Sequence, residues 1–167
     1  ANKAKASVDL NKIAERASLI SKGEWKHVAE LDFDLEEDLP SVMAIEGELY
    51  QVLLNLIVNA AHAVSANNHS TGRITIRTRS SDEFVELEIE DNGAGIPPAI
   101  SDKIFEPFFT TKDVGKGTGQ GLAIARDVIV NKHGGKIGFR DGPETGTIFS
   151  IWLPMRRVEE SSPAAAA

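Results

Sequence analysis

A single α/β domain is the fold class that the sequence predicts, because stretches of helical periodicity alternate along the chain with stretches of strand periodicity. The chain has 167 residues, 41% of them hydrophobic, which suffices for one domain with a core and is short for two. We find no internal repeat, no apolar run long enough to span a membrane and no signal-peptide pattern. We therefore expect one domain over residues 1–157, followed by a tail, 158–167, that is disordered or a remnant of cloning.

The first half of the chain predicts a helix, a strand and a longer helix. An amphipathic stretch, Val8–Lys22, predicts a helix that Gly23 ends. Alternating apolar residues in Trp25–Glu36 predict a strand. Glu48–Ala66 predicts the longest helix, which is largely buried because its apolar residues form a broad face. These residues are Leu49, Val52, Leu53, Leu56, Ile57, Ala60 and Val64.

The second half predicts two pairs of strands separated by a helix. Alternation around 74–76 and 84–90 indicates two strands that the turn Ser80–Glu83 joins as a hairpin. A short helix and turn follow at Pro97–Phe109, and then a glycine-rich stretch, Thr110–Thr118, that predicts a mobile loop. The last segments are a helix at Gly119–His133 and closing strands at Lys136–Arg140 and Thr145–Pro154.

Charge and cysteine usage exclude several classes of function. The net charge of −7 argues against a surface that coats nucleic acid, because a phosphate backbone would be repelled without a segregated basic patch. The chain contains no cysteine, so disulfides and thiolate metal sites are excluded.

A carboxylate and two glycines follow directly on the alternating strand Phe84–Glu90. Asp91 comes first, and Gly93 and Gly95 let the backbone turn tightly and leave open space beside it. Such a pattern is as typical of a tight turn capped by the aspartate as it is of a ligand site.

Polar side chains form a narrow stripe on the longest predicted helix. Gln51, Asn55, Asn59 and His62 have the spacing i, i+4, i+8, i+11, which places them on one face. Periodicity alone fits a solvated stripe as well as one that faces a ligand. The amide oxygen of Asn59 is a suitable ligand for Mg²⁺, which prefers oxygen donors and takes others from substrate phosphates.

Glycines also precede the predicted helix at Gly119–His133. The run from Gly115 to Leu122 brings backbone N–H groups to the positive end of a helix dipole, which favours phosphate binding. It matches neither the dinucleotide pattern G-x-G-x-x-G nor the P-loop. A flexible linker is the alternative, but Lys112 and Lys116 add positive charge to the same loop.

Together and in this order, these elements resemble the ATP-binding catalytic domain of sensor histidine kinases, a branch of the superfamily that also holds DNA gyrase, heat-shock chaperone and mismatch-repair ATPases. The resemblance covers most of the chain and rests on five motifs. They are the N box in Glu48–His62, the first glycine box Asp91-x-Gly93-x-Gly95, the F box Ile104–Lys112, the second glycine box Gly117-x-Gly119-x-Gly121, and the last-strand signature Thr145–Phe149.

The resemblance implies a Bergerat-type two-layer sandwich, in which a mixed, mainly antiparallel sheet of about five strands is covered on one face by about three helices. It also implies that Asp91 accepts a hydrogen bond from the adenine amino group and that Asn59 holds Mg²⁺. Ile96, Leu122 and Thr147 would line the adenine pocket, and the glycine loop would close over the phosphates. The full set expected to bind ATP and Mg²⁺ is Asn55, Asn59, His62, Asp91, Gly93, Gly95, Ile96, Thr110, Thr111, Lys112, Gly115, Lys116, Gly117, Thr118, Gly119, Gln120, Gly121, Leu122 and Thr147.

The implied reaction is transfer of the γ-phosphoryl group to a histidine on a separate dimerisation domain, and then to a response-regulator aspartate. Hydrolytic relatives carry a water-activating glutamate where this chain has Asn55, so rapid ATP hydrolysis is not expected. His27, His62, His69 and His133 all lack the residues that follow the family's acceptor histidine, so the acceptor is expected outside this chain.

Two departures and two alternatives accompany this expectation. A basic residue is frequent in the family where His62 stands, and Gln120 replaces a more usual apolar residue. The alternatives are a nucleotide-gated interaction module without transferase activity and a serine-directed kinase of the anti-sigma-factor type. We expect a cytoplasmic, monomeric domain without nucleic-acid or membrane contact, in a parent protein that is either soluble or membrane-anchored.

Overall fold

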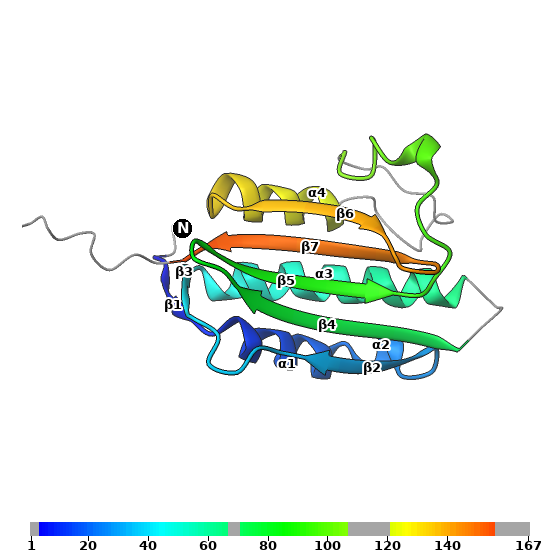
Figure 1. Ribbon diagram of the computed structural model, residues 1–167, viewed down its shortest axis with the longest axis horizontal. Coiled ribbons are helices and arrows are strands. Elements are labelled where there is room, and N and C mark those ends of the chain that lie inside the picture. Colours follow the sequence, from blue (N-terminus) through cyan, green and yellow to red (C-terminus); the bar gives the residue numbers. More distant parts are fainter. Residues whose placement is uncertain (1–3, 67–70, 107–120, 156–167) are drawn as a thin grey trace, which may run out of the picture.

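A five-stranded sheet with helices on one face forms the body of the computed structural model, which describes residues 4–66, 71–106 and 121–155 (Figure 1). The strand order is β2-β4-β5-β7-β6. Only the β2–β4 pair is parallel. The predicted mixed, mainly antiparallel sheet is thereby confirmed. The strands are β2 (Ala29–Asp34), β4 (Gly72–Ser80), β5 (Phe84–Asp91), β6 (Lys136–Asp141) and β7 (Thr147–Pro154).

The helical layer contains α1, α3 and α4 with its continuation. Helix α4 passes directly into a π-helix, η2. A separate two-stranded sheet pairs β1 with β3. Their bounds are β1 (Ala6–Val8), α1 (Leu10–Ile20), α2 (Lys22–Trp25), β3 (Val42–Ala44), α3 (Glu46–Ser65), the 3₁₀-helix η1 (Pro98–Ile100), α4 (Gly121–Arg126) and η2 (Asp127–Lys132). None of these helices is long and apolar enough to cross a bilayer.

The structure corrects the prediction around residues 20–28. Helix α1 ends at Ile20, before Gly23, because the backbone of Ser21 leaves the helical conformation with a φ of −87° and a ψ of 7°, and the Ser21 hydroxyl donates to the Ala17 carbonyl oxygen at 2.7 Å. Gly23 lies inside α2. The Trp25 indole N–H donates to the carbonyl oxygen of Ser18, which holds this ring against α1 and delays the strand until Ala29.

Smaller differences concern element ends. Helix α3 begins at Glu46, two residues earlier than predicted, and β7 begins at Thr147 because Gly146 turns the chain with a φ of +87°. The short strands β1 and β3 are not predicted, since three residues each are too few to show alternation. The predicted loop Thr110–Thr118 lies outside the described residues, as do 107–109 and 119–120.

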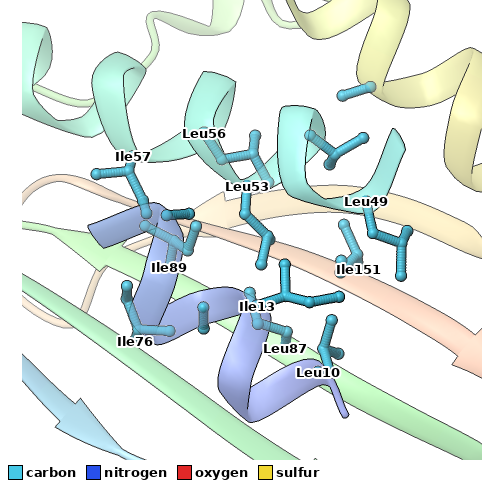
Figure 2. Packing of buried hydrophobic residues seen from close by; sticks show 14 of the residues in the cluster. Leu10, Ile13, Leu49, Leu53, Leu56, Ile57, Ile76, Leu87, Ile89 and Ile151 are labelled. Atoms are coloured by element: carbon cyan, nitrogen blue, oxygen red, sulfur yellow. The ribbon is translucent and has the colours of Figure 1, made fainter. Parts of the chain in front are cut away.

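The core lies between α3 and the sheet. Leu49, Leu53, Leu56 and Ile57 are each at most 1% exposed and point from α3 toward the side chains of α1 and the strands (Figure 2). The partners drawn with them are Leu10 and Ile13 of α1, Ile76 of β4, Leu87 and Ile89 of β5, and Ile151 of β7.

The opposite face of the sheet carries no helix in the described part of the chain (Figure 1), and its side chains form charge pairs. Arg77 donates to Glu88 at 3.2 Å and to Glu90 at 2.6 Å, and Arg140 donates to Glu88 at 2.8 Å. The hydrogen bond to Glu90 raises the pKa of Arg77 further. Cross-strand pairing of opposite charges lets this face remain open to water.

His133 joins the end of η2 to the start of α3. Its Nε2 accepts the Ile45 backbone N–H at 3.0 Å, so its Nδ1, 2.9 Å from the Val128 carbonyl oxygen, carries the proton and donates. The residue is 5% exposed. A neutral imidazole with both nitrogens engaged is therefore part of the helical layer.

We expect Leu53→Ala to lower the free energy of unfolding by about 2–5 kcal/mol, because it leaves a cavity between α3 and the sheet. The matched control is Leu19→Ala at a residue that is 68% exposed, with an expected change within about 0.5 kcal/mol. Urea unfolding followed by circular dichroism measures both. Equal losses in the two variants would contradict the position of the core.

Candidate nucleotide-binding site

Asp91 is a buried carboxylate at the end of β5. Its side chain faces the helical layer, because it continues the row of Val85, Leu87 and Ile89, all of them buried. The residue is 3% exposed. Its Oδ1 accepts the Gly93 backbone N–H at 2.9 Å, and the Thr147 backbone N–H also donates to the carboxylate. A carboxylate has about four acceptor positions, so two donors leave capacity for a ligand.

Burial raises the pKa of Asp91 to about 6 from an ordinary value of 3.8. The hydrogen bonds from Gly93 and Thr147 act in the opposite direction, but desolvation is larger, and the neighbouring charge of Glu90 adds to the rise. A further hydrogen-bond donor, such as one on a ligand, would stabilise the ionised form of this buried carboxyl group.

The turn after Asp91 is held by contacts from two sides. Asn92 binds the start of β4, accepting the Arg73 backbone N–H at 2.8 Å and donating to the Thr71 carbonyl oxygen at 2.7 Å. From the β6–β7 turn, Gly146 approaches so closely that a Cβ there would lie 2.0 Å from the Asp91 carbonyl oxygen. Gly95 adopts a φ of +85°, as expected for a tight glycine turn.

Helix α3 passes between this turn and the start of α4. A Cβ on Gly93 would lie 2.5 Å from the Ala63 carbonyl oxygen, and a Cβ on Gly121 would lie 3.7 Å from the Asn55 side chain. Asn59 is one helical turn from both Asn55 and Ala63, so it lies on the stretch of α3 between the two contacts. The predicted stripe, the glycine turn and the start of α4 therefore meet in one place.

The amide stripe of α3 consists of Gln51, Asn55 and Asn59, and His62 continues it toward the end of the helix. Its members differ in their contacts. Asn55 accepts a hydrogen bond from Gln51 at 2.9 Å and donates to the Gly121 carbonyl oxygen at 3.4 Å. His62 lies with its Nε2 3.9 Å from Glu24 of α2, a neighbour that the sequence pattern does not indicate.

Some of the other residues predicted to bind the nucleotide lie in the described part of the chain, and others lie outside it. Thr147 is 3% exposed and pairs with Asp91 across β5 and β7, while Ile96 and Leu122 are partly buried against the core. The F-box residue Phe105 contacts Phe139 of β6 and Phe149 of β7, with ring centroids 6.4 Å away in each case. Outside the described residues lie Thr110, Thr111, Lys112, Gly115, Lys116, Gly117, Thr118, Gly119 and Gln120.

A metal ion at this site would depend on few protein ligands. Within residues 4–66, 71–106 and 121–155, no group of three or more acidic, histidine or cysteine side chains could hold one. The half-buried amide of Asn59 fits a hard cation that keeps water and takes phosphate oxygens. The donor set is thus compatible with Mg²⁺ carried by a nucleotide and unsuited to a resident zinc ion.

The class of protein follows from a comparison with family models. Residues 44–157, which include α3 and the complete Asp91 turn, match the model described as "Histidine kinase-, DNA gyrase B-, and HSP90-like ATPase". The chain belongs to this family.

Individual relatives place it among the histidine kinases. The chain is 42% identical over 146 residues to sensor kinase CckA of Brucella abortus, an alignment that covers 78% of this chain and 15% of CckA. The solved catalytic domain of histidine kinase ThkA is 32% identical with a TM-score of 0.78, covering 92% of this chain and 99% of that one. Full-length ShkA with AMPPNP is 26% identical with a TM-score of 0.75, covering 93% and 32% respectively.

These matches show a histidine kinase catalytic domain of the ATPase type. The chain spans only 15% of CckA and 31% of sensor histidine kinase ZraS of Salmonella typhi.

The raised pKa of Asp91 predicts a pH-dependent contribution to stability. The folded state holds this proton more tightly than the unfolded chain, so the contribution is complete below about pH 4 and is lost as the pH rises to about 6. The difference in unfolding free energy between the ligand-free parent chain and Asp91→Asn should fall by about 2–3 kcal/mol from pH 4 to pH 7. Urea unfolding at several pH values measures it, and a constant difference would contradict the burial of the charge.

Proposed function

We propose that this domain binds ATP with Mg²⁺ and donates the γ-phosphoryl group to a histidine on a separate dimerisation and phosphoacceptor domain. The observation that carries the proposal is Asp91, a buried carboxylate with a raised pKa at the end of a strand, opposite the amide stripe of α3. Such a group needs a donor, and the 6-amino group of adenine is one.

Adenine recognition at Asp91 would be selective for physical reasons. Guanine carries an oxygen where adenine carries the amino group, so it would place an acceptor against a carboxylate that is already buried. A ligand that leaves a buried acceptor without a donor binds more weakly, because the hydrogen bond that the acceptor made to water is not replaced. Gly93 lets the turn lie directly against α3, where a Cβ would be 2.5 Å from the Ala63 carbonyl oxygen, and Gly95 supplies the positive φ of the turn.

The phosphates would extend from the Asp91 turn toward α4, along the stripe of α3. Asn59 would ligate Mg²⁺ through its amide oxygen, and the bound ion would neutralise charge on the phosphate oxygens. Asn55 lies beside Gly121 and cannot abstract a proton from water. This arrangement favours transfer to an external acceptor over hydrolysis.

The partners of the domain follow from the same proposal. The phosphoacceptor domain would belong to the same protein, and the receiver domain of a response regulator would take the phosphoryl group from it. The histidine kinase ThkA has been solved in complex with the response regulator TrrA, and the matching chain of that complex is 27% identical in sequence to this chain. A domain that uses ATP would lie in the cytoplasm.

The test combines binding and transfer. The chain is incubated with γ-labelled ATP, Mg²⁺ and the phosphoacceptor domain of its parent protein, and label on histidine is measured by its acid lability. Label that requires both proteins supports the proposal. Binding of ATP without labelled histidine would instead identify a nucleotide-gated module, and label on serine would identify a serine-directed kinase.

Asn59→Ala should remove most of the dependence of nucleotide affinity on Mg²⁺, because the metal loses its protein ligand. Titration calorimetry with ATP, in the presence of Mg²⁺ and of EDTA, measures this dependence. The control is Asn131→Ala on the exposed side of η2, where the amide donates a hydrogen bond to Asp127 at 2.8 Å. A metal dependence equal to that of the parent chain in Asn59→Ala would place the ion elsewhere.

A further inference from the structure

Thr145 connects two segments that are far apart in the sequence. Its hydroxyl donates to the Gly93 carbonyl oxygen at 2.8 Å, across a separation of 52 residues. The threonine lies in the turn between β6 and β7, and the glycine lies in the turn after Asp91. This is a side-chain bond from one loop to the backbone of the loop that carries the candidate adenine site.

The backbone of Gly93 is held from three directions. Its N–H donates to Asp91 Oδ1 at 2.9 Å, and its carbonyl oxygen accepts from Thr145. On a third side, the position of a Cβ would lie 2.5 Å from the Ala63 carbonyl oxygen, so the residue lies directly against α3. The carboxylate orientation therefore depends on a backbone segment whose own orientation includes the Thr145 bond.

Thr145 is itself fixed by the residue that follows it. Gly146 has a φ of +87°, and its Cβ position would lie 2.7 Å from the Asn92 Cα. Thr147 then pairs with Asp91 and donates its backbone N–H to the carboxylate. The three consecutive residues thus contact the turn at Gly93, Asn92 and Asp91.

We infer that Thr145 is a positioning residue for base selection: through the Gly93 backbone, its hydroxyl holds the Asp91 carboxylate in the orientation that accepts an amino group. This inference rests on the proposed function and adds the β6–β7 turn to the residues that determine purine specificity. A carboxylate held in one orientation rejects the guanine oxygen, whereas one free to rotate does so less strongly.

The experiment compares Thr145→Val with Thr145→Ser. Valine has nearly the same shape but lacks the hydroxyl, and serine restores the donor. Displacement of a fluorescent ATP analogue by ATP and by GTP, both with Mg²⁺, gives the two affinities. Thr145→Val should bind ATP about three- to tenfold more weakly, because the Asp91 turn is no longer held in the orientation that binds adenine before the nucleotide arrives, and the ratio of ATP to GTP affinity should fall. Thr145→Ser should restore both values.

Thr78→Val controls for a general loss of stability. The Thr78 hydroxyl accepts the Glu36 backbone N–H and donates to Asn11, far along the sheet from Asp91. This variant should be less stable, with unchanged affinities for ATP and GTP. If Thr145→Val loses stability but keeps the parent ratio of affinities, the threonine is only structural and the inference is wrong. If the parent chain does not bind ATP, the proposed function fails instead.

Discussion

The packing of α3 against the sheet is the interaction on which the rest of the structure depends. One side of this helix buries Leu49, Leu53, Leu56 and Ile57 between α1 and the central strands. At roughly 1.5–3 kcal/mol for each fully buried side chain, this face contributes more than any single polar contact in the molecule. Because the apolar face fixes the rotation of the helix, the amide stripe must point toward the Asp91 turn and α4. The core thereby determines where the candidate site can be.

Much of the fold could be predicted because its elements carry strong periodicity. In β5, Val85, Leu87 and Ile89 alternate with three glutamates, and α3 has an apolar face that runs from Leu49 to Val64, about four turns. The failures concern residues whose conformation is decided by distant or very local bonds. Trp25 fits a strand by pattern, yet its indole N–H bonds to α1. Ser21 caps α1 before the more obvious glycine can end it.

The candidate site could be predicted in part for the same reason. Asp91, Gly93 and Gly95 are adjacent in sequence, so their turn is visible as a local pattern, and Asn55 and Asn59 share a helical face. The resemblance to histidine kinases supplied their expected roles. The bond from Thr145 to Gly93 and the approach of Gly146 to Asp91 could not be anticipated, since both join segments about 50 residues apart and neither changes any local periodicity.

The change from α-helix to π-helix between α4 and η2 has a consequence for how this segment tolerates changes in length. A π-helical turn uses an i→i+5 bond and thus contains an extra residue relative to the α pattern. Val128 and Ile129 face the core and His133 meets the Ile45 N–H in the phase that this wider turn sets. Deleting that extra residue from η2 would let the turn close with α-helical i→i+4 bonds and would keep the residues after it near their present phase. His133 would then still meet the Ile45 N–H, whereas the same deletion in the α-helical turns of α4 would rotate the histidine by roughly 100° and turn it away from α3.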